Sequence, residues 1–281
     1  MLDFRVMKKE DLDFFMHLMD MVGWGMTLKD YDRILRFSPE GCFIASQDGR
    51  DLGIVASVNY GDIAWIGNLV VLPETRGKGI GAKLMRYCME YLVSTGTKAI
   101  RLDGVQPAIS LYHRLGFKDE YWSLRYLGEA TGHPETVCRP MRIEDLDSVS
   151  ELDLSVFNAP RREILEYVHE LFPDLCFTAW IDHELVGYIM AKDAKGQVKI
   201  GPWVVKKGYD EAAESLLVSV MNQRVGEKIW VGLPEANQSS VKILEKNGFQ
   251  PLPSSLRMCY GDCSIVENVE SVFGLGGPDK G

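Results

Sequence analysis

An internal repeat runs through most of this 281-residue chain. The stretch FRVMKKEDLDFF, which begins at Phe4, returns as CRPMRIEDLDSV, which begins at Cys138. The same spacing relates further pairs of segments: Cys42-Phe43 and Cys176-Phe177, Gly53 and Gly187, Ile66-Gly67 and Ile200-Gly201, and Val70-Val71 and Val204-Val205. A period of this length is too long for a solenoid unit and suits a domain, so the sequence predicts a tandem duplication.

The two copies can still be aligned near their ends, after a small change in spacing. Leu115-Gly116-Phe117 aligns with Asn247-Gly248-Phe249, and Ser123-Leu124-Arg125 aligns with Ser255-Leu256-Arg257. A linker is expected near residues 128–134. We therefore predict a first domain over residues 1–130, a second over residues 131–263 and a C-terminal tail over residues 264–281.

The periodicity of apolar residues in the first copy switches between that of strands and that of helices. We expect strands at residues 2–6, 41–46, 52–60, 63–72, 98–103 and 118–127, and helices at residues 11–21, 28–37, 79–94 and 107–115. Gly61-Asp62 suits a tight hairpin turn. This order predicts an α/β fold of the α+β mixed-sheet kind, in which each domain has a mixed, largely antiparallel sheet with helices on both faces.

Composition excludes several classes of protein. A chain that is 46% hydrophobic and 25% charged can form a core, and no apolar run approaches the roughly 18 residues of a membrane span. The N-terminus lacks the pattern of a secretory signal, so the cytoplasm is the expected location and a membrane is not an expected partner.

A net charge of −9 argues against nucleic-acid binding. The expected state is a monomer or a homodimer.

The six cysteines are scattered, with no histidine at metal-ligand spacing, so no metal site is expected. Most of them should be small buried hydrophobic residues. Cys259 and Cys263 are the only close pair, and by themselves they are weak evidence for a disulfide or a metal site.

A glycine-rich, basic turn follows the strand predicted at residues 63–72. It reads Arg76-Gly77-Lys78-Gly79-Ile80-Gly81-Ala82 and leads into a predicted helix. Glycines let several backbone N–H groups converge, and the helix N-terminus and the two cationic side chains add positive potential. The turn is therefore a predicted anion site, and a pyrophosphate is the expected guest.

Three other interpretations of this turn compete. A dinucleotide fingerprint fits Gly77, Gly79 and Ala82, with Asp103 as the acidic residue, but those glycines normally come directly after the first strand of the fold. A Walker loop fails because no Lys-Ser or Lys-Thr follows the glycines. A turn with no ligand would leave Arg76 and Lys78 unexplained.

At these residues the sequence resembles the GCN5-related N-acetyltransferases. Val71 to Gly81 resembles their R/Q-x-x-G-x-G/A acyl-CoA motif, and Ala108 to Phe117 resembles their second motif, although Gln106-Pro107 stands where an asparagine usually opens it. Gly23-Trp24 and the Tyr60–Trp65 hairpin resemble a tandem subfamily. The resemblance covers residues 1 to about 127, and it implies acetyl transfer from acetyl-CoA to an amine acceptor.

The resemblance also implies roles for particular residues. Leu69, Val70 and Val71 would meet the pantetheine and thioester, and residues 76–82 would bind the pyrophosphate. Tyr112 would donate a proton to the departing CoA thiolate, although it could also be an ordinary, partly buried helix tyrosine.

A base is needed because an alkyl ammonium with a pKa of about 10.4 must lose a proton before it attacks. Asp103, which ends a predicted strand, is the candidate for this base. The competing role for Asp103 is to cap the turn before Gly104. Trp24, Tyr31 and Trp65 could line an acceptor pocket, although aromatic residues at such positions are more often in the core.

The second copy lacks this chemistry. Opposite the glycine turn it has the single Gly208 followed by Asp210 and Glu211, and opposite Tyr112 it has Leu244. It resembles the degenerate acetyltransferase-like C-terminal domain of the tandem subfamily. The sequence thus predicts an N-acetyltransferase, and the alternative is a CoA-responsive binding or regulatory protein without turnover.

Overall fold

A computed structural model of the chain describes residues 1–134 and 136–281. The chain divides into two compact units, each built from segments that are separate in the sequence. Unit 1 consists of Met1–Glu120, Arg257–Cys263 and Pro278–Gly281, and unit 2 consists of Tyr121–Leu256 and Ser264–Gly277. Both units combine a mixed sheet with helices, which confirms the expected fold class.

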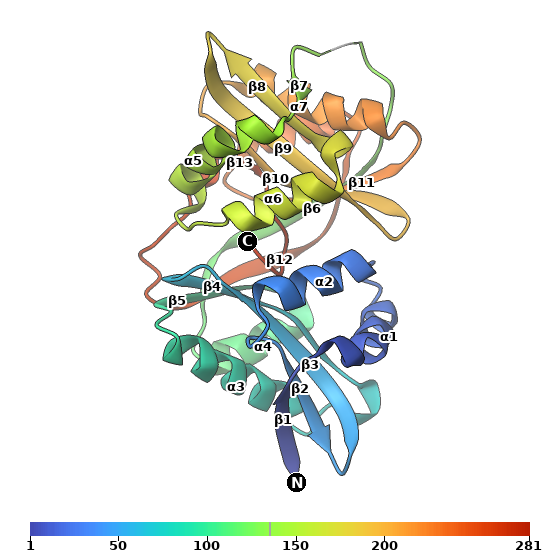
Figure 1. Cartoon of the computed structure of the whole chain (residues 1–281), viewed down its shortest axis with the longest axis vertical. Coiled ribbons are helices and arrows are strands. Elements are labelled where there is room, and N and C mark those ends of the chain that lie inside the picture. Colours follow the sequence, from blue (N-terminus) through green and yellow to red (C-terminus); the bar gives the residue numbers. More distant parts are fainter. Residues whose placement is uncertain (135) are drawn as a thin grey trace. The chain divides into compact units, whose positions relative to one another are not determined.

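Unit 1 follows the element order that the sequence predicts (Figure 1). Its elements are β1 (Leu2–Val6), η1 (Lys9–Asp11), α1 (Leu12–Val22), α2 (Leu28–Phe37), β2 (Phe43–Gln47), β3 (Arg50–Asn59), β4 (Ile63–Val71), η2 (Pro73–Thr75), α3 (Ile80–Ser94), β5 (Ala99–Gly104) and α4 (Gln106–Arg114). Strands β1 to β4 are antiparallel neighbours, and β5 runs parallel to β4.

Alternating residues of β2 show how helices cover both faces of this sheet. Phe43 packs against Tyr87 and Tyr91 of α3, with ring centroids 4.9 and 5.4 Å away. The next residue, Ile44, belongs to the core cluster that contains Phe15 of α1 and residues of α2. Successive side chains of a strand point to opposite faces, so α3 lies on one face and α1 and α2 lie on the other.

Strand β4 departs from regular geometry at the positions that matter for the predicted site. Its pairing with β3 shifts between Gly67 and Val70, and Asn68 within this bulge has a left-handed φ of 53°. Within the described residues, β4 pairs with β5 from Ile63 to Trp65 and then continues to Val71. Bulges bend a strand and locally end its pairing. The second half of β4 therefore diverges from β5.

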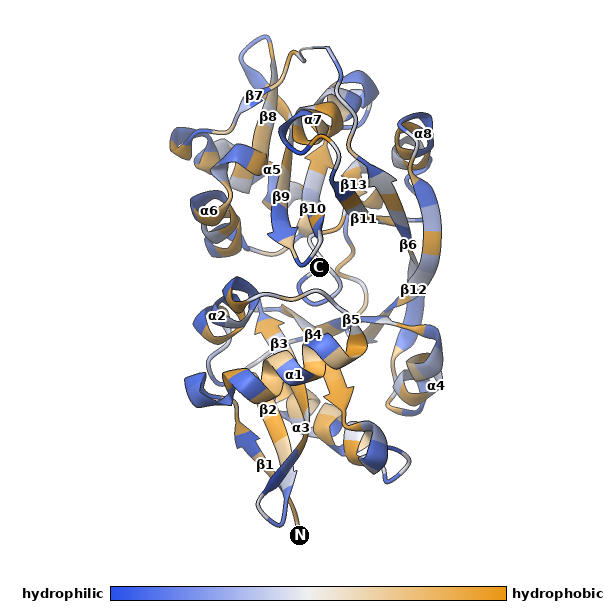
Figure 2. Ribbon diagram, turned by 90° about the vertical axis from the view of Figure 1, so that its right-hand side faces the viewer, coloured by the Kyte–Doolittle hydropathy of each residue, from blue (hydrophilic) through white to orange (hydrophobic). Residues whose placement is uncertain are grey.

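Unit 2 repeats this plan. Its elements are β7 (Arg139–Pro140), η3 (Ile143–Asp145), α5 (Leu146–Phe157), α6 (Arg162–Leu171), η4 (Pro173–Leu175), β8 (Cys176–Ile181), β9 (Glu184–Ala194), β10 (Gln197–Val205), α7 (Asp210–Gln223), β11 (Lys228–Pro234), α8 (Gln238–Lys246), η5 (Val269–Ser271) and β13 (Val272–Gly274). Figure 2 shows α2 and α6 with both hydropathy colours, as expected for helices with one face on a sheet.

Two long strands cross the boundary between the sequence repeats. Strand β6 (Lys118–Glu129) ends the first repeat, and its residues 123–129 pair with β11 in unit 2. Strand β12 (Gln250–Gly261) ends the second repeat, and its last five residues, Arg257–Gly261, belong to unit 1 beside β5. Each unit thus includes part of the last strand of the other repeat.

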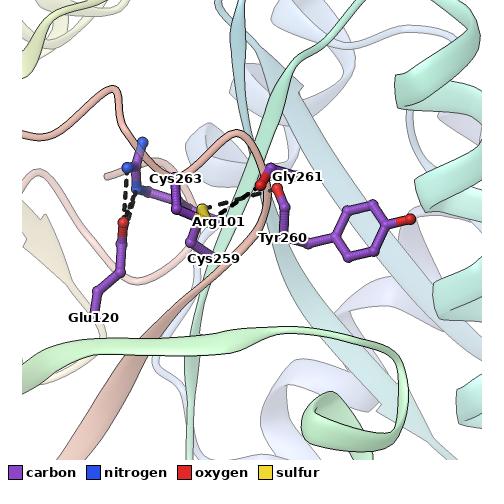
Figure 3. Close-up of a disulfide and its surroundings, with 6 residues drawn as sticks. All are labelled: Arg101, Glu120, Cys259, Tyr260, Gly261 and Cys263. Carbon is purple, nitrogen blue, oxygen red and sulfur yellow. Dashed lines mark hydrogen bonds and ion pairs between the residues drawn. A yellow bond between two sulfur atoms is a disulfide. The ribbon is translucent and has the colours of Figure 1, made fainter.

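A disulfide joins Cys259 at the end of β12 to Cys263 (Figure 3). The sequence left a disulfide and a metal site open for this pair, and the structure gives the disulfide. The other cysteines, Cys42, Cys88, Cys138 and Cys176, are free thiols. The residues expected to form a tail contain η5, β13 and a turn at residues 278–280.

Candidate active site

The glycine-rich turn connects η2 to the N-terminus of α3. Gly77 and Gly79 both have a φ of 78°, in the left-handed region that favours glycine, and Gly79 caps the helix. Open space surrounds the position that a β-carbon would take on either residue. The Arg76 side chain folds back and donates from Nε to the carbonyl oxygen of Val71, at 3.0 Å.

The amide of Arg76 donates to the carbonyl of Pro73, whereas the amides that follow it in this turn are available to a ligand. In the described ranges, no hydrogen bond is found for the N–H groups of residues 77–82, and the first amide with an acceptor is that of Lys83, which donates to Gly79. The first turn of α3 contains no acidic residue. Unpaired amides at a helix N-terminus attract anions, so the turn can bind a phosphate or pyrophosphate.

The residues expected to meet the acyl group lie just before this turn, on the divergent half of β4. Leu69, Val70 and Val71 lie beyond Trp65, the residue at which the pairing of β4 with β5 ends. Val70 is buried, and its neighbours are half-buried. A strand edge without a neighbouring strand presents its N–H and C=O groups to a ligand, so an extended pantetheine arm could pair with it.

Tyr112 lies on α4, and its ring is buried. Its ring carbons pack against Gly104 at the end of β5, and Phe117 meets the ring edge-on at a centroid distance of 6.0 Å. Burial raises the pKa of Tyr112 to about 12. The hydroxyl therefore keeps its proton at neutral pH, as a proton donor must.

Asp103 forms an ion pair that the sequence analysis did not anticipate. Arg257 of β12 donates from Nη2 to Oδ2 at 2.7 Å and from Nε to Oδ1 at 3.2 Å. Both side chains are buried, with exposed fractions of 1% for Asp103 and 0% for Arg257. The partners are 154 positions apart in the sequence, and no local motif signals the contact.

The three aromatic residues proposed for an acceptor pocket do not lie together on an open surface. Trp65 is completely buried, and the guanidinium carbons of Arg101 and Arg257 lie 5.7 and 5.1 Å from its ring centroid. Tyr31 is buried and donates its hydroxyl to the carbonyl of Lys8. Only Trp24, which is 37% exposed, can meet a solute in this conformation.

The corresponding place in unit 2 is filled by the protein itself. Helix α7 begins with Asp210 and Glu211, whose negative charges disfavour an anion. Strand β13 pairs with β10 at Trp203 and Val204, and Leu275 donates its amide to Gly232 of β11. The chain thus occupies the gap between β10 and β11. Leu244, which stands opposite Tyr112, is completely buried.

Two features outside this site bear on function. Across residues 1–134 and 136–281, His, Cys, Asp and Glu side chains do not gather in any group of three or more that could hold a metal ion. Over the same residues, each helix is too short or too polar to cross a membrane.

Comparison with known proteins identifies the family of this chain. Residues 9–117 match the family model described as the acetyltransferase (GNAT) family, and residues 149–274 match a second acetyltransferase (GNAT) domain model. An uncharacterized N-acetyltransferase of Archaeoglobus fulgidus is 32% identical over 118 residues, which are 36% of this chain and 80% of the relative. A holothin acyltransferase of Pseudoalteromonas is 22% identical over 85% of this chain and 81% of its own length.

Solved structures share the two-domain arrangement. A presumed acetyltransferase of Pyrococcus horikoshii has a TM-score of 0.83 at 22% identity and covers 100% of this chain and 96% of its own. A tandem GNAT protein from the clavulanic acid biosynthesis pathway has a TM-score of 0.66 at 16% identity, over 93% of this chain and 98% of its own. The fold is of the mixed α/β class. The chain belongs to the GNAT superfamily, with two GNAT domains in tandem.

Proposed function

We propose that this chain is an N-acetyltransferase that moves the acetyl group of acetyl-CoA to a primary amine of a small molecule or peptide. The observation that carries the proposal is the set of unpaired amides at residues 77–82, directly after a strand that diverges from its neighbour. Amides of this kind suit the pyrophosphate of CoA, and Arg76 and Lys78 add positive charge. The divergent part of β4 suits the pantetheine arm.

The reaction would proceed by direct attack within a ternary complex. The amine nitrogen forms a bond to the thioester carbon as the carbon–sulfur bond breaks. The departing thiolate takes a proton from Tyr112, whose buried hydroxyl stays protonated at neutral pH. The new amide nitrogen loses its extra proton, which returns to the tyrosinate directly or through water. In this proposal, backbone amides near Leu69 and Val70 would stabilise the developing oxyanion.

Asp103 is the candidate for the base that accepts the proton of the attacking ammonium, acting directly or through water. The ion pair with Arg257 opposes this role, since a proton on Asp103 would cancel the negative charge with which the buried guanidinium pairs. A role in holding Arg257 and the end of β5 competes with the role as base. The two roles predict different behaviour of Asp103→Asn, which is set out in the Discussion.

The test is to incubate the full chain with acetyl-CoA and a panel of amines and to follow thiol release. We expect at least one amine to raise thiol release above the amine-free rate, with an acetylated amine of matching amount in the mass spectrum. Tight binding of acetyl-CoA without amine-dependent thiol release would instead support a CoA-responsive binding protein. No binding of acetyl-CoA at all would overturn both functions.

A further inference from the structure

The short segment Pro278–Gly281 belongs to unit 1, although the residues before it belong to unit 2. Asp279 lies between α2 and β4: its side chain pairs with Arg33 of α2, and its Cβ lies 2.6 Å from where a β-carbon on Gly67 would stand. Tyr60 donates its hydroxyl to the carbonyl of Lys280 at 2.8 Å. Figure 1 places this end of the drawn chain beside α2.

Arg33 is buried, with 4% of its surface exposed, and it is incompletely paired. Its Nη2 donates to Asp279, and its Nε has no hydrogen-bond acceptor in the part of the chain that the structure describes. Two other buried arginines donate from both Nε and Nη2 to a single carboxylate: Arg257 to Asp103, and Arg161 to Asp153. Asp279 is therefore an imperfect partner for this guanidinium.

The place that Asp279 occupies adjoins the proposed acyl site. Gly67, against which Asp279 lies, precedes Leu69 and Val70 on β4, and a strand rises about 3.3 Å per residue, so Gly67 is roughly 7 to 10 Å from the positions proposed for the thioester. Gly67 has no side chain, which makes room for a chain to lie against β4. Residues 278–280 form a turn and belong to no strand or helix of the unit.

We propose that Arg33 is the carboxylate-binding residue of an acceptor site in unit 1, and that Asp279 occupies this site as an internal ligand. The acceptor is then an amine that also carries a carboxylate, such as an amino acid or an acidic peptide. Its carboxylate takes the place of Asp279 and pairs with both Nε and Nη2 of Arg33. The inference rests on the proposed acetyl transfer, because it names the acceptor of that reaction.

An exchange of carboxylates is favoured over simple release of the segment. Arg33 is buried, and removing Asp279 without a replacement would leave its guanidinium with the charge of Asp30 nearby but without the carboxylate to which it is hydrogen-bonded. Asp30, the other acid near Arg33, is already used by Thr27, whose amide and hydroxyl both donate to it at 3.0 Å. Lys280 pairs with Asp279 at 3.4 Å and would leave together with it.

The first test compares acids with their amides as acceptors: glycine and glycinamide, β-alanine and β-alaninamide, lysine and lysinamide. Asp279→Asn removes the competing charge and keeps the shape, so we expect KM for the acids to fall about tenfold or more, with KM for the amides unchanged. Arg33→Gln should raise KM for the acids by a similar factor. Each variant is compared with the wild type on the same amine, because amidation itself changes the pKa of an amine.

Asp62→Asn is the matched control, since Asp62 is an exposed carboxylate of unit 1 that pairs with Lys98. We expect Asp62→Asn to leave the KM values for the acids and for the amides unchanged. Arg33→Lys keeps the charge and loses the two-atom fork, so it should weaken the acids less than Arg33→Gln does. If neither Arg33 variant folds, the response of Asp279→Asn still decides the question. Equal effects of Asp279→Asn on acids and amides, or no effect on either, would overturn the inference.

A second measurement separates this inference from the proposed function. Binding of the same acids is measured by calorimetry on the CoA-loaded wild type and Asp279→Asn proteins, without any acetyl donor. Acid binding that is strengthened by Asp279→Asn supports the Arg33 site even if no amine is acetylated. If acids and amides are both acetylated and Asp279→Asn changes their KM values by equal factors, the result supports the enzyme and contradicts the carboxylate site.

Discussion

Asp103 at the end of β5 and Arg257 of β12 form a buried ion pair, with Nη2 and Oδ2 2.7 Å apart. The two residues come from different repeats, and both lie in unit 1. Arg257 also lies over the ring of Trp65. The pair therefore links three neighbouring strands of unit 1, namely β4, β5 and the end of β12, and it makes the stability of this unit depend on a residue near the other end of the sequence.

We predict that Asp103→Asn destabilises the protein by about 3 to 5 kcal/mol, because it removes the carboxylate charge with which the buried Arg257 guanidinium pairs. Chemical denaturation measures this loss. Replacing both residues, as in Asp103→Asn with Arg257→Leu, should recover part of it. Asp62→Asn, at an exposed pair, should leave stability unchanged. A folded, fully stable Asp103→Asn protein whose kcat has collapsed would instead assign Asp103 the role of base.

Tyr112→Phe should lower kcat by roughly 10- to 100-fold and leave the affinity for acetyl-CoA nearly intact. The hydroxyl matters mainly as negative charge grows on sulfur, and a thiol with a pKa of about 8.5 is already a fair leaving group, so the loss falls at or below the low end of the acid–base range. Tyr87→Phe, at a partly exposed tyrosine of α3 whose ring packs on Phe4 and Phe43 of the sheet, is the control. An unchanged kcat, with chemistry shown to limit the rate, would remove Tyr112 from the mechanism.

The raised pKa of Tyr112 makes a separate prediction about pH. Burial stabilises the neutral hydroxyl, so the folded protein holds this proton up to a pH of about 12, whereas the unfolded chain loses it near pH 10. This contribution to stability is fully present below pH 10 and is lost as the pH rises through that window. Wild-type protein should therefore lose more stability than Tyr112→Phe between pH 10 and pH 12, as measured by denaturation at each pH. Equal losses would contradict the burial of this hydroxyl.

Local features of the fold could be predicted from the sequence, and contacts between distant segments could not. The strand and helix order of unit 1 and the glycine turn before α3 follow from periodicity and from residue type. The exchange of β6 and β12 does not, because both strands carry the same Ser-Leu-Arg motif and either could complete either sheet. The aromatic residues show the same limit: burial of Trp65 depends on Arg101 and Arg257, which only tertiary structure brings to its ring.

The make-up of unit 1 predicts the behaviour of its first segment in isolation. Residues 1–130 expressed alone lack Arg257–Cys263, so β5 loses its β12 neighbour and Asp103 loses the guanidinium with which it pairs. We expect a lower melting temperature than that of the full chain and concentration-dependent association in size-exclusion chromatography. A monomeric fragment that melts at the temperature of the full chain would show that β12 is dispensable for this unit.

The most direct test of the central claim is a calorimetric titration of the chain with acetyl-CoA. The account predicts one site per chain, because the turn before α3 offers unpaired amides, whereas α7 begins with two acids and β13 fills the gap beside β10. Gly79→Asp should abolish binding, since it places a negative charge and a strained left-handed residue at the pyrophosphate site. Gly208→Asp, which introduces the same residue at a φ of 90° in unit 2, should leave binding intact. Two equivalent sites per chain, or unchanged binding in Gly79→Asp, would contradict the account.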